Sequence, residues 1–158
     1  MTAPQFVHLR LHSEYSIVDG LVRIDDIVKA AAADKQPALA VTDLANLFGM
    51  VKFYKAARGK GVKPIVGADV WITNDDDRDK PFRLLLLVKN RTGYLQLCEL
   101  LASAWLTNQH RGRAEIRIDW LDALQEKGGL IALSGFNAGD IGVALENGNE
   151  ALAYRCAQ

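Results

Sequence analysis

The chain has 158 residues, of which 49% are hydrophobic and 24% are charged, and its formal net charge is zero. This composition is typical of an ordinary globular protein and gives no sign of disorder. The neutral balance gives no overall attraction to nucleic acid, and no apolar run is long enough to cross a membrane, so we expect a cytoplasmic protein with no membrane contact. Cys98 and Cys156 lack a paired spacing, and we interpret them as reduced thiols.

The N-terminal segment predicts a short strand followed by a polar loop. In residues 7–12 apolar and ionisable side chains alternate, which places His8, Arg10 and His12 on one face. The loop that follows reaches Asp19, and imidazole and carboxylate groups at this spacing are one way to build a metal site. A histidine is more often an ordinary hydrogen-bonded residue, however, and a guanidinium binds no metal. From these residues alone, a metal site is the weaker of the two interpretations.

Helices and strands alternate over the next sixty residues. The pattern predicts a helix over residues 24–33, a strand over 38–43, a helix over 46–61 and a strand over 64–73. The strand over 38–43 begins with a short apolar run, as in strands that are buried on both faces. In the second helix, the apolar spacing predicts one stripe formed by Leu47, Met50, Val51, Tyr54 and Ala57.

The second half of the chain continues the alternation. An acidic run at residues 75–79 predicts a solvated turn, because it lacks the regularly spaced oxygen ligands of a calcium loop. The remaining pattern predicts a strand over 82–88, a helix over 92–107, a loop over 108–113, a short helix from 119, a strand over 129–134 and two short helices over 137–156. In the predicted loop, Arg111 and Arg113 beside His110 could contact phosphate, although a short basic tip is more often only solvated.

This alternation predicts an α/β fold, either a β/α barrel or a doubly wound sheet. In both architectures the functional residues lie at the carboxyl ends of the strands. At those ends the sequence places His12, Asp19, Asp43 and Asp69, followed by Ser134 and the glycine after it.

Five ordered segments then carry a resemblance to a known family. They are FVHLRLHSEYSIVDG (6–20), ALAVTDLANLFGMVKFYKAA (38–57), GVKPIVGADV (61–70), LLLLVKNRTGYLQLCELLA (84–102) and GLIALSG (129–135). They resemble the start of the PHP (polymerase and histidinol phosphatase) domain of bacterial replicative DNA polymerase III alpha subunits. The resemblance implies that residues 1–158 are the N-terminal part of a single PHP domain, a distorted seven-stranded β/α (TIM-like) barrel that is truncated before it closes. It also implies that the polymerase domains are absent.

Metal-binding members of the family have a His-x-His after the first strand, an Asp before the next Gly and a His after Thr-Asp. In this sequence the His-x-His falls on Arg10 and His12, and the aspartate falls on Asp19. The histidine after Thr-Asp is replaced by Leu44. The resemblance therefore implies that two of these four ligands are lost.

The remaining family ligands lie further along the chain. The glutamate of the Gly-x-Glu motif falls on Asp69, which is a shorter carboxylate. The histidine that opens the leucine-rich strand is replaced by Arg83, and the cysteine after Ser-Gly is replaced by Phe136. Only His12 and Asp19 keep the ligand of the family outright.

The lost ligands favour a vestigial metal site in this region. Leu44 and Phe136 have no donor atom, and the guanidinium groups of Arg10 and Arg83 would repel a cation. We expect these arginines to replace the metal charge in an ion-pair network with one or more of Asp19, Asp43 and Asp69.

The resemblance implies a role in DNA replication. The expected function is that of the N-terminal PHP region of a DNA-directed DNA polymerase, a nucleotidyltransferase whose magnesium-dependent chemistry resides in the absent domains. This region would be catalytically silent, would need no cofactor, and would dock the proofreading exonuclease among other subunits of the polymerase III holoenzyme. DNA would be bound through the absent domains. The alternative is a metal-dependent PHP phosphoesterase or 3′-5′ exonuclease that keeps residual activity through His12, Asp19 and Asp69.

Overall fold

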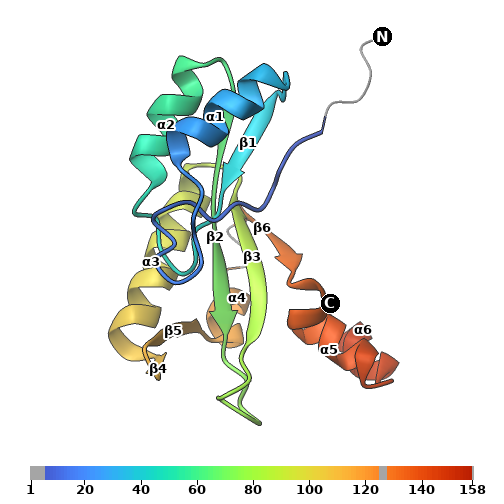
Figure 1. The fold of residues 1–158 in the computed structure, drawn as a ribbon. Helices are drawn as coiled ribbons and strands as arrows, with labels where there is room; N and C mark the ends of the chain where they lie inside the picture. The colour runs from blue at the N-terminus through green and yellow to red at the C-terminus, as the bar shows by residue number, and fades with distance from the viewer. Residues whose placement is uncertain (1–5, 125–127, 158) are drawn as a thin grey trace. The chain divides into compact units, whose positions relative to one another are not determined.

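The computed structural model describes residues 6–124 and 128–157, and the chain divides into two compact units, residues 1–68 and 69–158 (Figure 1). Strand β2 (Lys63–Ile72) begins in the first unit and continues into the second. The α/β class predicted from the sequence is confirmed. In the described part of the chain, no helix has the length and apolar character needed to span a membrane.

The first unit is a two-stranded parallel sheet covered by two helices. Helix α1 (Ile24–Ala33) has the predicted bounds. The same is true of strand β3 (Phe82–Val88), which belongs to the second unit. Strand β1 (Ala38–Val41) is buried over its whole length, and it pairs with the start of β2 so that Ala38 lies opposite Lys63. The core consists of the apolar side chains that these elements turn inward: Ile24, Val28, Ala31, Leu39, Val41, Phe53, Ala57 and Val62.

The predicted N-terminal strand is not formed as a regular strand. His8 makes an isolated parallel bridge to Leu39, and the backbone N–H of Thr42 donates to the carbonyl of Leu11 at 2.9 Å. The N–H of Leu11, however, donates to Oγ1 of Thr42 at 2.8 Å. Because a side chain replaces the neighbouring backbone in this hydrogen bond, the segment lies along β1 without extending the ladder.

Helix α2 (Met50–Gly59) starts four residues later than predicted. The reason is local, because the Asn46 side chain accepts a hydrogen bond from the N–H of Phe48 at 3.0 Å and holds residues 46–49 in a turn. Asparagine favours this type of turn over the first residues of a helix.

The buried face of α2 also differs from the prediction. Phe53 and Ala57 are fully buried, and of these only Ala57 belongs to the predicted stripe. Val51 and Tyr54 belong to that stripe but are 56% and 46% exposed. A single wide apolar stripe therefore does not describe this helix, because it has an apolar inner face and a mixed outer face.

The second unit contains a mixed sheet with the strand order β4-β5-β2-β3-β6. After β3 come α3 (Arg91–Thr107), β4 (Gln109–His110), β5 (Arg113–Ile116), α4 (Ile118–Asp122), β6 (Leu130–Ser134), the 3-10 helix η2 (Phe136–Ala138), α5 (Asp140–Glu146) and α6 (Glu150–Cys156). Strand β5 is parallel to β2, whereas β6 is antiparallel to β3. Neither a purely parallel barrel nor a closed one is formed by the described residues.

Strands β4 and β5 form a hairpin where the sequence predicted a loop, so the prediction for residues 108–113 was wrong. The two strands are antiparallel, with His110 opposite Arg113. The alternation of Arg113 and Glu115 with two buried apolar residues is a strand pattern. It was missed because a charged pair at the start of a strand resembles a solvated turn.

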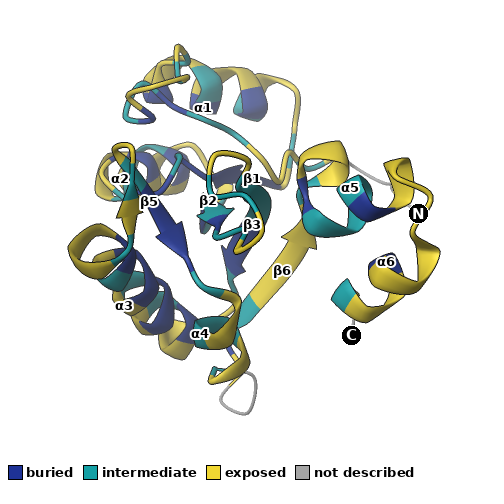
Figure 2. Ribbon diagram, turned by 90° about the horizontal axis from the view of Figure 1, so that it is seen from below, coloured by how far each residue is buried: buried dark blue, intermediate teal, exposed yellow. Residues whose placement is uncertain are grey.

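Strand β6 forms the edge of this sheet in the described residues. It pairs with β3 along Leu130–Ser134, and Figure 2 shows that most of its length is exposed. Ile131 and Leu133 belong to the exposed apolar residues of the chain. The sequence of β6 has no charged residue or proline that would protect the edge from pairing with another strand.

The contact between Gly93 and Gly129 provides a test of this packing. Asn90 caps α3 by accepting from the N–H of Gly93 at 3.0 Å, and a Cβ atom on Gly93 would lie 1.8 Å from the carbonyl oxygen of Gly129. We predict that Gly93→Ala lowers the free energy of unfolding by more than about 2 kcal/mol, measured by urea denaturation.

Gly59→Ala is the matched control for this substitution. Gly59 ends α2, and an added Cβ atom there meets no atom within 4 Å. This substitution should leave stability unchanged or raise it by about 0.5–1 kcal/mol, because alanine has the higher helix propensity. Equal losses in the two variants would contradict the close packing of Gly93.

Candidate functional site

The first unit places two of the predicted residues together. Nδ1 of His12 lies 2.8 Å from Oδ2 of Asp19, and the imidazole is mostly buried. The loop between them closes on itself, because the hydroxyl of Ser16 donates to Oδ1 of Asp19 at 2.6 Å and accepts from the N–H of Leu44 at 2.9 Å. His12 and Asp19 are therefore held by protein hydrogen bonds.

Asp43 lies beneath this loop at the end of β1 and is 2% exposed. Its two carboxylate oxygens accept from the backbone N–H of Ser13 at 2.6 Å and from the Ser13 hydroxyl at 2.9 Å. Burial raises the pKa of Asp43, and the two hydrogen bonds from Ser13 oppose that shift. The carboxylate therefore acts as an anchor for the loop.

A surface ion-pair cluster fixes the same loop from outside. Glu14 binds both Arg23 and Lys52, and Nζ of Lys52 lies 2.8 Å from Oε1. The hydrogen bond from Lys52, assisted by that from Arg23, lowers the pKa of Glu14. Exposed ion pairs of this kind contribute little to stability. Their effect is to join the loop to α2.

In the second unit, Arg83 on β3 pairs with Asp69 on β2. Nε donates to Oδ1 at 2.9 Å, and Nη2 lies 2.8 Å from Oδ2, so the guanidinium faces both oxygens of the carboxylate. Asp69 is 2% exposed and the Arg83 side chain is 11% exposed. The guanidinium also stacks on Trp71, with its central carbon 4.2 Å from the ring centroid.

This pair belongs to a larger charged face of the sheet, which consists of Asp69, Trp71, Arg83, Arg113 and Glu115. Trp71 lies opposite Glu115 in the parallel pairing of β2 and β5, so the two side chains share a face. The guanidinium of Arg113 is 5.8 Å from the centroid of the Trp71 ring. Cations and one aromatic ring thus alternate across this face between two buried carboxylates.

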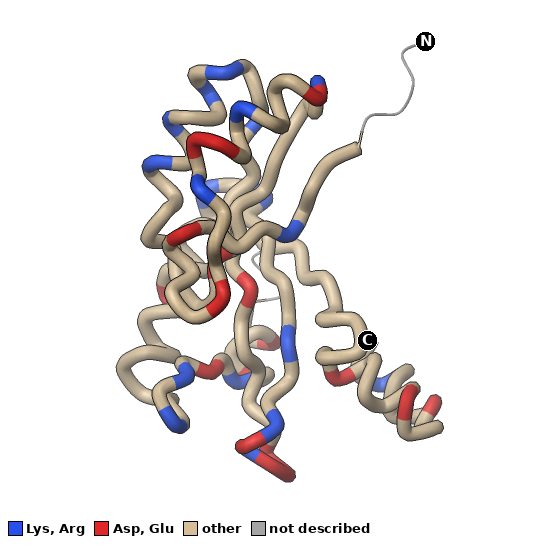
Figure 3. The backbone as a smooth tube through the Cα atoms, viewed as in Figure 1, with Lys and Arg blue, Asp and Glu red and all other residues tan. Residues whose placement is uncertain are grey.

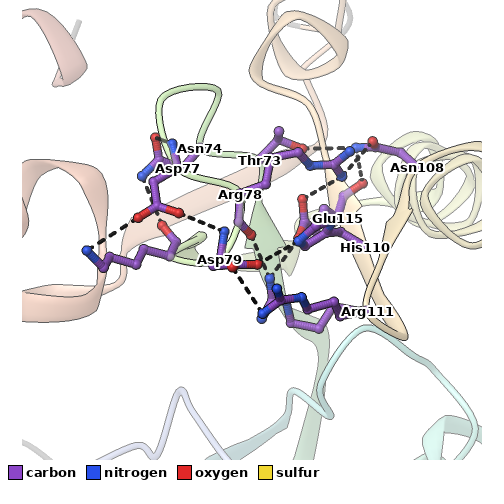
Figure 4. A network of polar contacts seen from close by, with 11 residues as sticks. Thr73, Asn74, Asp77, Arg78, Asp79, Asn108, His110, Arg111 and Glu115 are labelled. Atoms are coloured by element: carbon purple, nitrogen blue, oxygen red, sulfur yellow. Dashed lines mark hydrogen bonds and ion pairs between the residues drawn. The ribbon is translucent and has the colours of Figure 1, made fainter.

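Glu115 is fully buried, and its carboxylate pairs with Arg78 from the β2–β3 turn and with Arg113 on β5. Nη2 of Arg78 donates to Oε2 at 2.8 Å, and Nη2 of Arg113 lies 3.4 Å from Oε1 (Figure 4). Arg78 also donates to Oδ1 of Asn108 at 3.0 Å, and Asn108 donates to the hydroxyl of Thr73 at 2.9 Å. The turn between β2 and β3 is thereby fastened to the β4–β5 hairpin.

The acidic turn and the basic tip of the hairpin meet at Asp79. Nε2 of His110 is 2.8 Å from Oδ1 of Asp79, and Nη1 of Arg111 is 3.0 Å from Oδ2 (Figure 4). The hydrogen bond from His110, with Arg111 nearby, lowers the pKa of Asp79. The predicted solvated turn is correct, and its Asp79 pairs with His110 and Arg111 of the tip that was considered for phosphate contact. Arg113 of that tip pairs instead with Glu115.

The positions that would carry further family ligands lie in unusual backbone. Phe136 is 83% exposed and has a φ angle of 53°. Ala45, which follows Leu44, has a φ angle of 52°. Residues other than glycine rarely adopt this left-handed conformation, and such strain concentrates at functional sites. Arg10 lies on the exposed segment before the loop.

The family's metal positions carry few metal-donor atoms in the described residues. Among the residues that the structure describes, no group of three or more His, Cys, Asp or Glu side chains is placed to hold a metal. Leu44 and Phe136 offer no ligand, and the oxygens of Asp69 face a guanidinium. A zinc or manganese centre requires about four to six donors.

Several residues of this region were not singled out in the sequence. Ser13 and Ser16 provide the hydroxyl groups that fix Asp43 and Asp19, and Thr42 bonds the N-terminal segment. The usable signal is the two serines that follow His12 in a polar loop, since serine hydroxyls readily form local hydrogen bonds. The Glu115 network carried no local signal, because Arg78 lies 37 residues before its partner.

A family model for the PHP domain matches residues 8–158. The chain belongs to the PHP domain family. It is 48% identical over 158 residues to the DNA polymerase III subunit alpha of Neisseria meningitidis serogroup A, a match that covers 99% of this chain and 14% of that protein. It is 47% identical over 156 residues to the same subunit of Escherichia coli K12, with 99% of this chain and 13% of that protein covered.

This PHP chain also has a partial likeness to a solved structure, an amidohydrolase from Chromobacterium violaceum. The TM-score is 0.49 and the identity is 22%, over 62% of this chain and 32% of that one. The PHP chain spans only about a seventh of the length of its curated polymerase relatives, since it covers 14% of the first of them.

The Arg83–Asp69 pair predicts a large and specific loss of stability. Arg83→Met should lower the free energy of unfolding by about 3–5 kcal/mol, because it leaves a buried carboxylate without its cation. Adding Asp69→Asn should restore much of that loss, and a double-mutant cycle by urea denaturation measures the coupling. Additive effects of the two substitutions would show that the pair is not energetically coupled.

Asp43 predicts a pH dependence of stability. Folding raises its pKa above the ordinary value of 3.8, so its contribution favours the folded state at acid pH and is lost as the pH rises through the raised pKa. Asp43→Asn removes this titration. The stability of the wild type minus that of the variant should therefore fall from acid pH toward neutral pH and then level off, as measured by urea denaturation at each pH. A difference that rises with pH would contradict the assignment.

Proposed function

We propose that this chain is the N-terminal PHP region of a bacterial replicative DNA polymerase III alpha subunit. Its identity of 47–48% to alpha subunits over nearly the whole chain supports this proposal. The parent chain would then catalyse DNA-templated DNA synthesis, a nucleotidyl transfer that uses magnesium, in domains outside these residues. It would act in the cytoplasm, within the polymerase III holoenzyme.

Within that subunit, we propose that this region is a catalytically silent structural domain. The observation that carries the proposal is the ion pair of Arg83 with Asp69, at two positions where metal-binding members have a histidine and a glutamate. A guanidinium there supplies a fixed positive charge. It has no atom that coordinates a metal, and it does not activate a water molecule. Leu44 and Phe136 remove two further donors.

A second function is a PHP phosphoesterase or 3′-5′ exonuclease with residual activity through His12, Asp19 and Asp69. The contact of 2.8 Å between His12 and Asp19 favours it, because two ligand-type side chains remain together. The donor chemistry supports the silent domain more strongly, since the oxygens of Asp69 are already paired with a cation.

Metal analysis and hydrolysis assays separate the two functions. We predict that the protein, incubated with manganese or zinc and desalted, retains far less than one ion per chain by elemental mass spectrometry. Hydrolysis of p-nitrophenyl phosphate and of an end-labelled oligonucleotide should not exceed that of the buffer. Activity that appears with metal and disappears in His12→Ala would overturn the silent domain and support the second function.

We also propose that this region docks the proofreading exonuclease subunit, and a binding experiment tests that role. The PHP chain and the proofreading exonuclease subunit of the same replicase should co-elute in size-exclusion chromatography and give a saturable calorimetric isotherm. Arg83→Met/Asp69→Asn serves as the control variant, because the proposal assigns that pair to the fold and not to the partner. Failure of the wild type to bind the exonuclease would overturn the docking role and leave the polymerase assignment intact.

A further inference from the structure

Helix α2 and the turn after it carry only positive charges, although the net charge of the whole chain is zero. Between Asp43 and Asp69 the sequence has no acidic residue, and its five basic residues are Lys52, Lys55, Arg58, Lys60 and Lys63. All five are exposed. In Figure 3 the trace of α2 carries only blue segments. A run of cations without anions is an electrostatic footprint for a negatively charged partner.

Most of these cations have no counter-charge among the residues that the structure describes. Lys52 is bound to Glu14 and so belongs to the loop cluster. In the described part of the chain, by contrast, Lys55, Arg58 and Lys60 form no ion pair. Their positive charge is therefore available to a ligand.

The outer face of α2 adds an aromatic ring to these cations. Tyr54 is 46% exposed and lies four residues before Arg58, so the two side chains are neighbours on one helix face. Lys55 lies beside them at three residues from Arg58. An exposed tyrosine beside cations lets a nucleic-acid base stack while its phosphate is neutralised.

A groove runs between α1 and α2, on the flank of α2 that carries Lys55, Ala56, Gly59 and Lys60. Its volume is about 350 Å³, and three of its lining residues are Lys29, Lys55 and Lys60. Asp25 also lines it, near the first turn of α1. Nζ of Lys29 lies 3.8 Å from Oδ1 of the exposed Asp26, and an ion pair at this distance on the surface is weak. The groove thus has more basic than acidic side chains in its lining.

We propose that the α2 basic surface, formed by Lys29, Lys55, Arg58, Lys60 and Tyr54, binds single-stranded DNA through its phosphate backbone and one stacked base. A single strand fits the observations better than an acidic peptide does, because the surface combines cations with an exposed aromatic ring. None of these five residues is one of the family's metal positions. The surface also differs from the expectation that DNA contacts lie only outside this chain.

Fluorescence anisotropy of the PHP protein with a labelled oligothymidylate of about 20 nucleotides tests the proposal. Binding should be saturable at about 50 mM salt and should weaken steeply toward about 200 mM. The triple variant Lys55→Glu/Arg58→Glu/Lys60→Glu should lose at least about tenfold in affinity. It should also lower the slope of log K against log salt by about 2, since each phosphate contact on a single strand contributes about 0.7.

Tyr54→Ala separates stacking from charge. This variant should lose affinity several-fold while its salt slope stays that of the wild type, because no cation is removed. An unchanged affinity in Tyr54→Ala would overturn the stacked base.

The matched control reverses three exposed cations of the second unit, Lys80→Glu/Lys89→Glu/Arg91→Glu. It should bind as the wild type does, and circular dichroism with thermal unfolding should show that both triple variants are folded. An absence of binding by the wild type, or an equal loss in the control, would overturn the proposal. Competition by polyglutamate as strong as that by unlabelled oligothymidylate would assign the surface to an acidic protein instead.

Discussion

Buried carboxylates are the constraint on which this protein depends. Asp43, Asp69 and Glu115 are each at most 2% exposed, and a carboxylate taken out of water must be neutralised or fully hydrogen-bonded. In the first unit, the backbone N–H and the hydroxyl of Ser13 donate hydrogen bonds to the carboxylate of Asp43. The second unit uses guanidinium groups, which reach across strands and turns. The paths of the polar loop, the β2–β3 turn and the β4–β5 hairpin all follow from these solutions.

The elements that local pattern determines were predicted well from the sequence. Helix α1 and strand β3 have the predicted bounds, because their apolar periodicity is uninterrupted. The start of α2 and the nature of β5 were not predicted, since each depends on a polar side chain. An asparagine turn delays α2, and β5 buries a glutamate whose partner lies far along the chain. Local periodicity does not report such partners.

The candidate site shows the same division. The family resemblance located the positions of interest, and the sequence hypothesis paired Arg10 or Arg83 with Asp19, Asp43 or Asp69. The structure pairs Arg83 with Asp69, whereas Asp43 is bonded to Ser13. Which cation meets which carboxylate depends on strand pairing and loop closure, and neither is encoded at the positions themselves. The left-handed backbone beside the lost ligands could not be foreseen either, because neither residue is a glycine.

The guanidinium of Arg83 has a further consequence for how this domain is maintained. A metal ion is a dissociable component, so the stability that it confers varies with its free concentration and disappears with a chelator. An arginine on β3 is present at one copy per chain by covalent attachment, and no mass-action term governs its occupancy. If the proposed silent role is right, a domain neutralised in this way would keep its fold at any supply of zinc or manganese. The positive charge that neutralises Asp69 is a covalent part of the chain, so it does not have to be bound from the cell.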